Sequence, residues 1–193
     1  VGPSAWKSRR AARGTIISWY GSREAYGARQ TASSSIALVG ARASTAYGDN
    51  VTATMSAGLV DKGWAVTSGA AFGIDVAAHR GALAAGGTTM AVLACGIDRD
   101  YPTAHSVILG EIARTGLVIT EYPPGSTVAR RRFLTRNRLV AALSEAVIVV
   151  EVSRARLARI EGIAAAVAAS AARPSLTYLY DSDLDWTGHR WGV

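Results

Sequence analysis

Short apolar runs alternate with longer segments of helical period along most of this chain, and this alternation restricts its fold more than any other feature. The runs are largely β-branched or aliphatic, which is typical of strands covered by helices on both faces. Strands that alternate with helices form βαβ units around a parallel sheet. We therefore predict an α/β fold with a parallel sheet and helices on both faces. The predicted strands are SIALVG (35–40), WAVTSG (64–69), TTMAVLAC (88–95), LVITE (117–121) and AVIVVE (146–151).

The segments between these strands carry apolar residues four positions apart, as one face of a helix requires. Lys62 and Gly63 end the first of these helices with a cation and a glycine. The spaced residues are Val51, Met55 and Leu59 in the first helix, Ile74, Ala78 and Ala82 in the second, and Ile108 and Ile112 in the third.

The two ends of the chain have weaker patterns. Residues 1–34 form a poorly defined N-terminal segment, in which IISWY (16–20) could add a strand. The main domain is expected over 35–180, with a helix over 155–171 and a strand at SLTYLY (175–180). Residues 181–193 are polar and aromatic and are interpreted as a tail.

Composition indicates a globular protein that attracts anions. Of the 193 residues 49% are hydrophobic and 18% charged, and the formal net charge is +7. Nucleic acid is the most abundant polyanion that such a charge attracts. Cys95 is the single cysteine, so neither a disulfide framework nor a cysteine–histidine metal site is expected, and no cofactor is predicted. The absence of a long apolar stretch and of a secretory leader predicts a cytoplasmic protein without a membrane segment.

Glycines follow most of the predicted strands, at the edge of the sheet where open α/β folds bind ligands. The segment SGAAFGIDVAAH (68–79) leads from a strand into a helix, and its Ser68, Gly69 and Gly73 could bring backbone amides close to a phosphate. These glycines could equally serve only a tight connection. The spacing matches neither a dinucleotide fingerprint nor a P-loop, which argues against hydride transfer and ATP hydrolysis.

Three other side chains near this edge carry groups that could act at a binding site. Arg42 follows the first strand within Gly40-Ala41-Arg42 and can bind a phosphate or stack on a base. Asp75 lies in the first turn of a helix, where the dipole stabilises a carboxylate without any catalytic role. His79 shares its face, and a packed histidine is the favoured interpretation.

The segment ARRRFLTRNR (129–138) concentrates five arginines around Phe133. An aromatic ring among guanidinium groups, here including Arg136 and Arg138, is typical of surfaces that bind single strands with little sequence preference. Asn137 could read a base edge or cap the helix that runs into LVAALSEAV (139–147). An arginine-rich helix start that faces only water is the alternative.

Seven motifs in order resemble the DNA-processing protein A family, also called DprA or Smf, over about residues 35–151. They are VGAR (39–42), AYG (46–48), SGAAFGID with AAHRGAL (68–83), AVLACGIDRDYP (91–102), EYPPG (121–125), RFLTRNRLVAALS (132–144) and IVVE (148–151). The resemblance implies an extended Rossmann-like domain that binds single-stranded DNA without enzymatic activity. In natural transformation such proteins protect incoming strands and load the RecA recombinase onto them.

Functional residues carry over where the motifs match. The resemblance assigns the lining of the strand-binding pocket to Gly40, Ala41 and Arg42 and to the segment from Phe133 to Arg138, and it places the glycine loop at Ser68 to Asp75. It also implies RecA and a second copy of the chain as partners, through contacts that lie largely toward the C-terminal part in that family.

Two departures from the family pattern leave alternatives open. Leu134 replaces a common proline, and VSRARLARIEGIAAAV follows Glu151 in place of a Ser/Gly-rich turn. An inactive, truncated copy of such a protein therefore stays open. A nucleoside-monophosphate phosphoribohydrolase-like enzyme is the alternative from another class, although only PPGST (123–127) echoes its glycine-rich signature.

Overall fold

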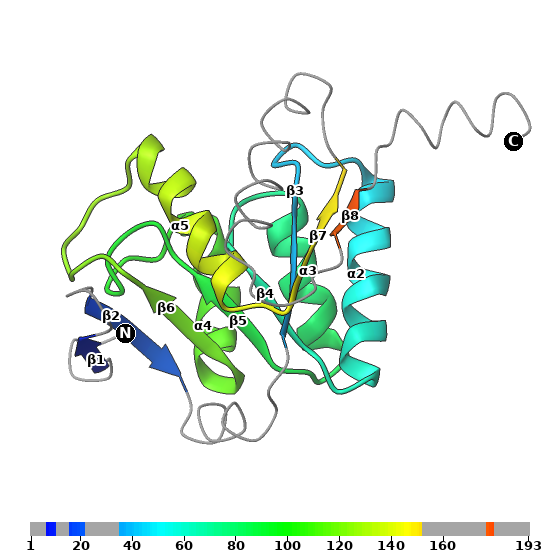
Figure 1. The fold of residues 1–193 in the computed structure, drawn as a ribbon, viewed down its shortest axis with the longest axis horizontal. Coiled ribbons are helices and arrows are strands. Elements are labelled where there is room, and N and C mark those ends of the chain that lie inside the picture. The colour runs from blue at the N-terminus through cyan, green and yellow to red at the C-terminus, as the bar shows by residue number, and fades with distance from the viewer. Residues whose placement is uncertain (1–6, 11–15, 22–34, 152–176, 180–193) are drawn as a thin grey trace, which may run out of the picture.

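The computed structural model describes residues 7–10, 16–21, 35–151 and 177–179. Eight strands form one sheet in the order β1-β2-β6-β5-β4-β3-β7-β8 (Figure 1). The strands are β1 (Lys7–Arg10), β2 (Ile16–Gly21), β3 (Ser35–Gly40), β4 (Ala65–Ser68), β5 (Thr89–Val92), β6 (Leu117–Thr120), β7 (Ala146–Val150) and β8 (Thr177–Leu179). All five predicted central strands are therefore confirmed, and β5 ends three residues earlier than expected.

The strands from β6 to β8 pair in parallel, as predicted. The two N-terminal strands differ, because β2 pairs antiparallel with β6 and β1 antiparallel with β2. The strand suggested by residues 16–20 thus forms and extends the sheet at the β6 edge. The strand predicted near 175–180 is β8, whereas the helix predicted over 155–171 lies outside the described residues.

Within the described residues, four α-helices and one short 3₁₀ turn, η2 (Thr103–His105), connect the strands. The helices are α2 (Ala46–Asp61), α3 (Ile74–Ala84), α4 (Ser106–Thr115) and α5 (Arg130–Ala142). The first three follow the predicted apolar periods. The start of α5 corrects the sequence interpretation: Asn137 lies inside this helix, so it does not cap it.

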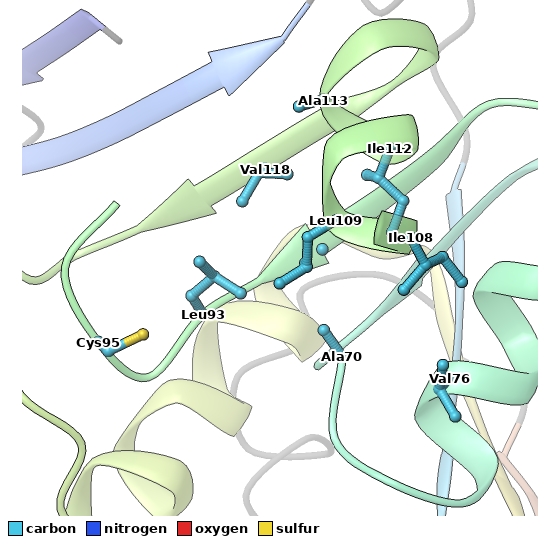
Figure 2. Close-up of a cluster of buried hydrophobic side chains, with 10 residues drawn as sticks. Ala70, Val76, Leu93, Cys95, Ile108, Leu109, Ile112, Ala113 and Val118 are labelled. Carbon is cyan, nitrogen blue, oxygen red and sulfur yellow. The ribbon is translucent and has the colours of Figure 1, made fainter. Parts of the chain in front are cut away.

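Alternating side chains of each strand point to two separate apolar layers, as the period of a strand requires. On one face, Leu139 and Val140 of α5 pack against Ala37, Met90 and neighbouring strand residues. On the other face, α2, α3 and α4 cover the sheet. Figure 2 shows part of this second layer, where Leu109 and Ile112 of α4 face Val118, and Cys95 is buried nearby. Helices on both faces are confirmed.

The chain reverses direction across the sheet at β3. From β3 it runs through β4, β5 and β6 on one side, and then returns to place β7 on the other side of β3. In open α/β sheets a crevice opens at such a reversal, outside the carboxyl ends of the strands. Here the crevice lies beside Gly40, the last residue of β3, and Glu151, which follows β7.

No helix within the described ranges is long and apolar enough to cross a membrane.

Candidate nucleic-acid interface

A pocket of about 820 Å³ opens at this reversal, between the carboxyl ends of β3 and β7 and the exposed side of α5. Its lining combines apolar walls with four arginines and two carboxylates. The lining residues are Val39, Gly40, Ala41, Arg42, Gly69, Ala71, Asp75, Tyr101, Val128, Ala129, Arg130, Arg131, Phe133, Leu134, Arg136, Asn137, Val140, Val149 and Glu151. The fold therefore brings the segment after β3 and the arginine-rich helix together.

Arg42 and Phe133 form a stacked pair on the pocket wall. The guanidinium carbon Cζ of Arg42 lies 4.6 Å from the centre of the Phe133 ring, within the range of a cation–π contact. Arg42 is exposed, and Phe133 is partly buried. Tyr101 adds a second ring, with its centre 5.8 Å from that of Phe133. The wall thus presents flat groups and a positive charge to the space beside it.

Arg136 lies in the floor of the pocket with only 4% of its surface exposed. Its Nη1 donates hydrogen bonds to the carbonyl oxygens of Gly69 and Val92, and its Nη2 lies 3.9 Å from Oδ2 of Asp75. Burial lowers the pKa of Arg136, and the Asp75 carboxylate opposes that shift. This guanidinium is therefore directed to protein groups rather than to solvent.

Asp75 is the buried partner of that cation. Burial raises its pKa, while the Arg136 guanidinium and a hydrogen bond from the backbone N–H of Ala71 act in the opposite direction. The carboxylate thus faces the inside of the molecule at the start of α3. It adds little negative charge to the open side of the pocket, because Arg136 lies beside it.

The space beside the glycines of this loop is occupied by other groups of the protein. A Cβ at Gly69 would overlap the Arg136 guanidinium, and a Cβ at Gly73 would overlap the backbone of Ala41 and Arg42. Gly73 also has a φ of +75°, which side chains rarely adopt. Ser68 donates its hydroxyl to the carbonyl of Leu38 at 2.6 Å. The loop could bind phosphate or serve only as a tight connection between strand and helix, and the second interpretation accounts for these contacts.

Glu151 occupies the amino end of α2. Both of its carboxylate oxygens accept hydrogen bonds from the backbone N–H of Thr45, at 3.0 and 2.8 Å, and one also accepts from the Thr45 hydroxyl. Gly48 makes room for this carboxylate, since a Cβ there would overlap it. The amino end of α2, which anions favour, is thus already filled by a side chain of this protein.

The remaining predicted residues separate into two groups. Asn137 lines the pocket together with Gly40 and Ala41. Arg138 does not line it: its Nη2 donates to both carboxylate oxygens of Glu121, at 2.7 and 2.6 Å, on another side of α5.

His79 is fully buried, as the packed interpretation requires. The hydroxyl oxygen of Thr89 accepts a hydrogen bond from its Nδ1 at 2.7 Å, because that hydroxyl itself donates to the carbonyl of Val66. Burial, aided by Arg136 and His105, lowers the pKa of His79 to about 3. It is neutral at physiological pH and lies away from the pocket lining.

Most residues of the pocket lining were not predicted as site residues, among them Tyr101, Val128 and Leu134. Tyr101 belongs to the motif AVLACGIDRDYP, so the motif itself was a signal. Leu134 is 64% exposed, and its position next to Phe133 was the available hint. Among the described residues no group of histidine, cysteine or acidic side chains could hold a metal ion.

Comparison with known proteins relates this architecture to one family. The model of the family DNA recombination-mediator protein A matches residues 25–173. The putative DNA processing protein DprA of Mycobacterium tuberculosis is 58% identical over 115 residues, 60% of this chain and 30% of that protein. The DNA processing protein DprA of Streptococcus pneumoniae is 40% identical over 116 residues, 60% of this chain and 41% of that protein. The chain thus spans well under half the length of these curated relatives.

Solved structures agree with the sequence comparison. The X-ray structure of DNA processing protein A from Streptococcus pneumoniae matches with a TM-score of 0.70 and 30% identity, over 84% of this chain and 54% of that one. A structure concerning the single-stranded DNA binding mode of DNA processing protein A from Helicobacter pylori matches with a TM-score of 0.73 and 25% identity, over 89% and 80% of the two chains. By its family match and by this shared α/β, Rossmann-like fold, the chain belongs to the family of DNA recombination-mediator protein A.

Proposed function

We propose that this protein binds single-stranded DNA in the pocket between β3, β7 and α5, without catalysing a reaction on it. The observation that carries the proposal is the stacked pair of Arg42 and Phe133 at the wall of that pocket. Bases of any identity stack on aromatic and guanidinium planes, and arginine also neutralises phosphate. Membership of the recombination-mediator family and the subject of the Helicobacter pylori structure support the same ligand.

The contacts fall into separate roles under this proposal. Arg42 and Phe133 take a base and its phosphate, and Arg130 and Arg131, both exposed at the pocket edge, attract the backbone. Asn137 offers an amide to a base edge. Arg136 acts as a positioning residue, because its guanidinium holds the carbonyls of Gly69 and Val92.

The backbone of Gly40 and Ala41 forms the wall from which Arg42 extends. Gly73 fixes the path of that backbone, since the next residue, Ile74 at the start of α3, donates a backbone hydrogen bond to the carbonyl of Ala41 at 3.1 Å. Gly69 lines the pocket, and the buried Ser68 lies directly before it in the chain. The glycine loop therefore supports the site by positioning Arg42 and Arg136, and the phosphate contacts are assigned to the exposed arginines.

The charge around the pocket favours a polyanion. Both lining carboxylates are paired within the protein, Asp75 with Arg136 and Glu151 with the amino end of α2. The exposed arginines therefore dominate the field outside the pocket. Association should be fast and should weaken steeply with salt, because each phosphate contact releases condensed counterions.

Family membership supports a wider role that we add to the proposal. We assign the protein to DNA processing in the cytoplasm during natural transformation, with protection of incoming single strands and loading of RecA as its activities. A homodimer is part of the same proposal.

Phe133→Ala tests the platform. Loss of one stacked base should weaken binding to oligo-dT by about 1 to 3 kcal/mol, measured by fluorescence anisotropy, while the thermal unfolding curve changes little because the ring is partly exposed. Phe133→Trp is the matched control, since it keeps a ring at this position. Unchanged affinity of Phe133→Ala would remove the platform.

A further inference from the structure

A second guanidinium–aromatic stack lies on another side of α5, outside the pocket. The Cζ atom of Arg132 is 4.7 Å from the centre of the Tyr122 ring, nearly the same distance as in the pair of Arg42 and Phe133. Arg132 and Phe133 are consecutive in α5, so their side chains leave the helix about 100° apart. The two stacks therefore flank the same helical turn.

The second stack is held in place by the protein. Nη1 of Arg132 donates a hydrogen bond to the carbonyl of Thr127, and both Arg132 and Tyr122 are partly buried. A guanidinium fixed on a ring loses little further freedom when a ligand covers it. Such a pair is ready to accept a flat group.

The charges around this stack also suit a phosphate backbone. Glu121 precedes Tyr122, but its carboxylate is bound by Arg138 and is largely buried. Arg130 and Arg131 are exposed on the first turn of α5 and line the pocket, and Arg132 of the second stack follows them in the same turn. Figure 1 shows that the loop after β6 leads to this end of α5, at the carboxyl side of the sheet. Three consecutive arginines at the start of α5 thus place positive charge beside both stacks.

We infer that a single strand held in the pocket continues over the first turn of α5 and places a further base on the stack of Tyr122 and Arg132. The inference rests on the proposed function, because it extends the path of the same ligand. It predicts that short oligonucleotides fill only the pocket, whereas longer ones also reach Tyr122.

The test measures affinity against oligo-dT lengths from about 4 to about 16 nucleotides, the range of sites on known single-strand-binding folds. Tyr122→Ala should leave the affinity for the shortest oligonucleotides unchanged. For the longest it should weaken binding about 5- to 150-fold, the value of one stacked base. Tyr122→Phe keeps the ring and should bind like the unchanged protein at every length.

Arg132→Ala provides a second variant with an independent reading. For long oligonucleotides alone, it should make the negative slope of log K against log salt shallower by about 1. Arg114→Ala, which removes an exposed arginine from α4 on the opposite face of the sheet, should leave the slope unchanged. A stack that only fixes the loop between β6 and α5 would not produce this dependence on length.

The outcomes separate this inference from the proposed function. If Tyr122→Ala and Arg132→Ala bind long oligonucleotides normally while Phe133→Ala binds weakly, the second stack is refuted and the pocket stands. Equal weakening by Tyr122→Ala at all lengths also refutes it, because the residue would then belong to the pocket. Normal binding by Phe133→Ala at every length refutes the proposed function itself.

Discussion

Replacement of Arg136 by methionine should strongly destabilise the protein, although methionine fits an apolar environment well. The change leaves the Asp75 carboxylate buried without its cation, and it leaves the carbonyls of Gly69 and Val92 without their donor. Breaking a buried ion pair by removing one partner costs about 3 to 5 kcal/mol. For a chain of this size, that corresponds to a decrease of roughly 6 to 20 °C in the unfolding temperature.

The effect should depend on pH in a defined direction. Burial raises the pKa of Asp75 above its ordinary value of 3.8, and Arg136 limits that rise. Removing Arg136 therefore raises the pKa further. A carboxyl with a higher pKa in the folded state favours folding below its unfolded pKa, and this contribution is lost as the pH rises through the folded pKa. The destabilisation should thus be largest at pH 7 and shrink as the pH falls toward about 4.

Thermal and urea unfolding followed by circular dichroism at both pH values provide the measurement. Arg138→Met is the matched control from the same helix: its side chain is 61% exposed, and such surface pairs contribute about 0 to 1 kcal/mol. Asp75→Asn added to Arg136→Met should restore part of the lost stability. Equal unfolding temperatures of the two arginine variants at pH 7, or no recovery of stability on adding Asp75→Asn, would contradict a stabilising buried pair of Asp75 and Arg136.

Two further predictions concern the pocket floor and the absence of catalysis. Gly69→Ala should displace the Arg136 guanidinium and lower stability by about 1 to 3 kcal/mol, as overpacking does. Gly110→Ala, whose Cβ meets open space on α4, should instead raise the unfolding temperature, and the reverse order would contradict the packing argument. Incubation with nucleoside monophosphates should release no free base by chromatography, and release that disappears in Phe133→Ala would favour the enzymatic alternative.

The sequence alone determined the framework, because burial on both faces of a parallel strand demands an unbroken apolar run. Such runs therefore predicted the strands at residues 35–40, 117–120 and 146–150 directly. The spacing of apolar residues four positions apart predicted α2, α3 and α4 in the same way. The order of strands and helices also placed Arg42 and the glycine loop at the binding edge, since successive βαβ units align the carboxyl ends of their strands.

The sequence could not show which arginines of α5 line the pocket and which bind other groups of the protein. Their roles depend on where the helix starts and on which groups lie opposite each side chain, and every residue turns the direction by about 100°. The helix begins at Arg130 instead of after Asn137, which turns Arg136 inward and Arg138 toward Glu121. Tertiary structure alone decided these directions, because the partners of Arg136, Gly69 and Val92, lie 67 and 44 residues away in the chain.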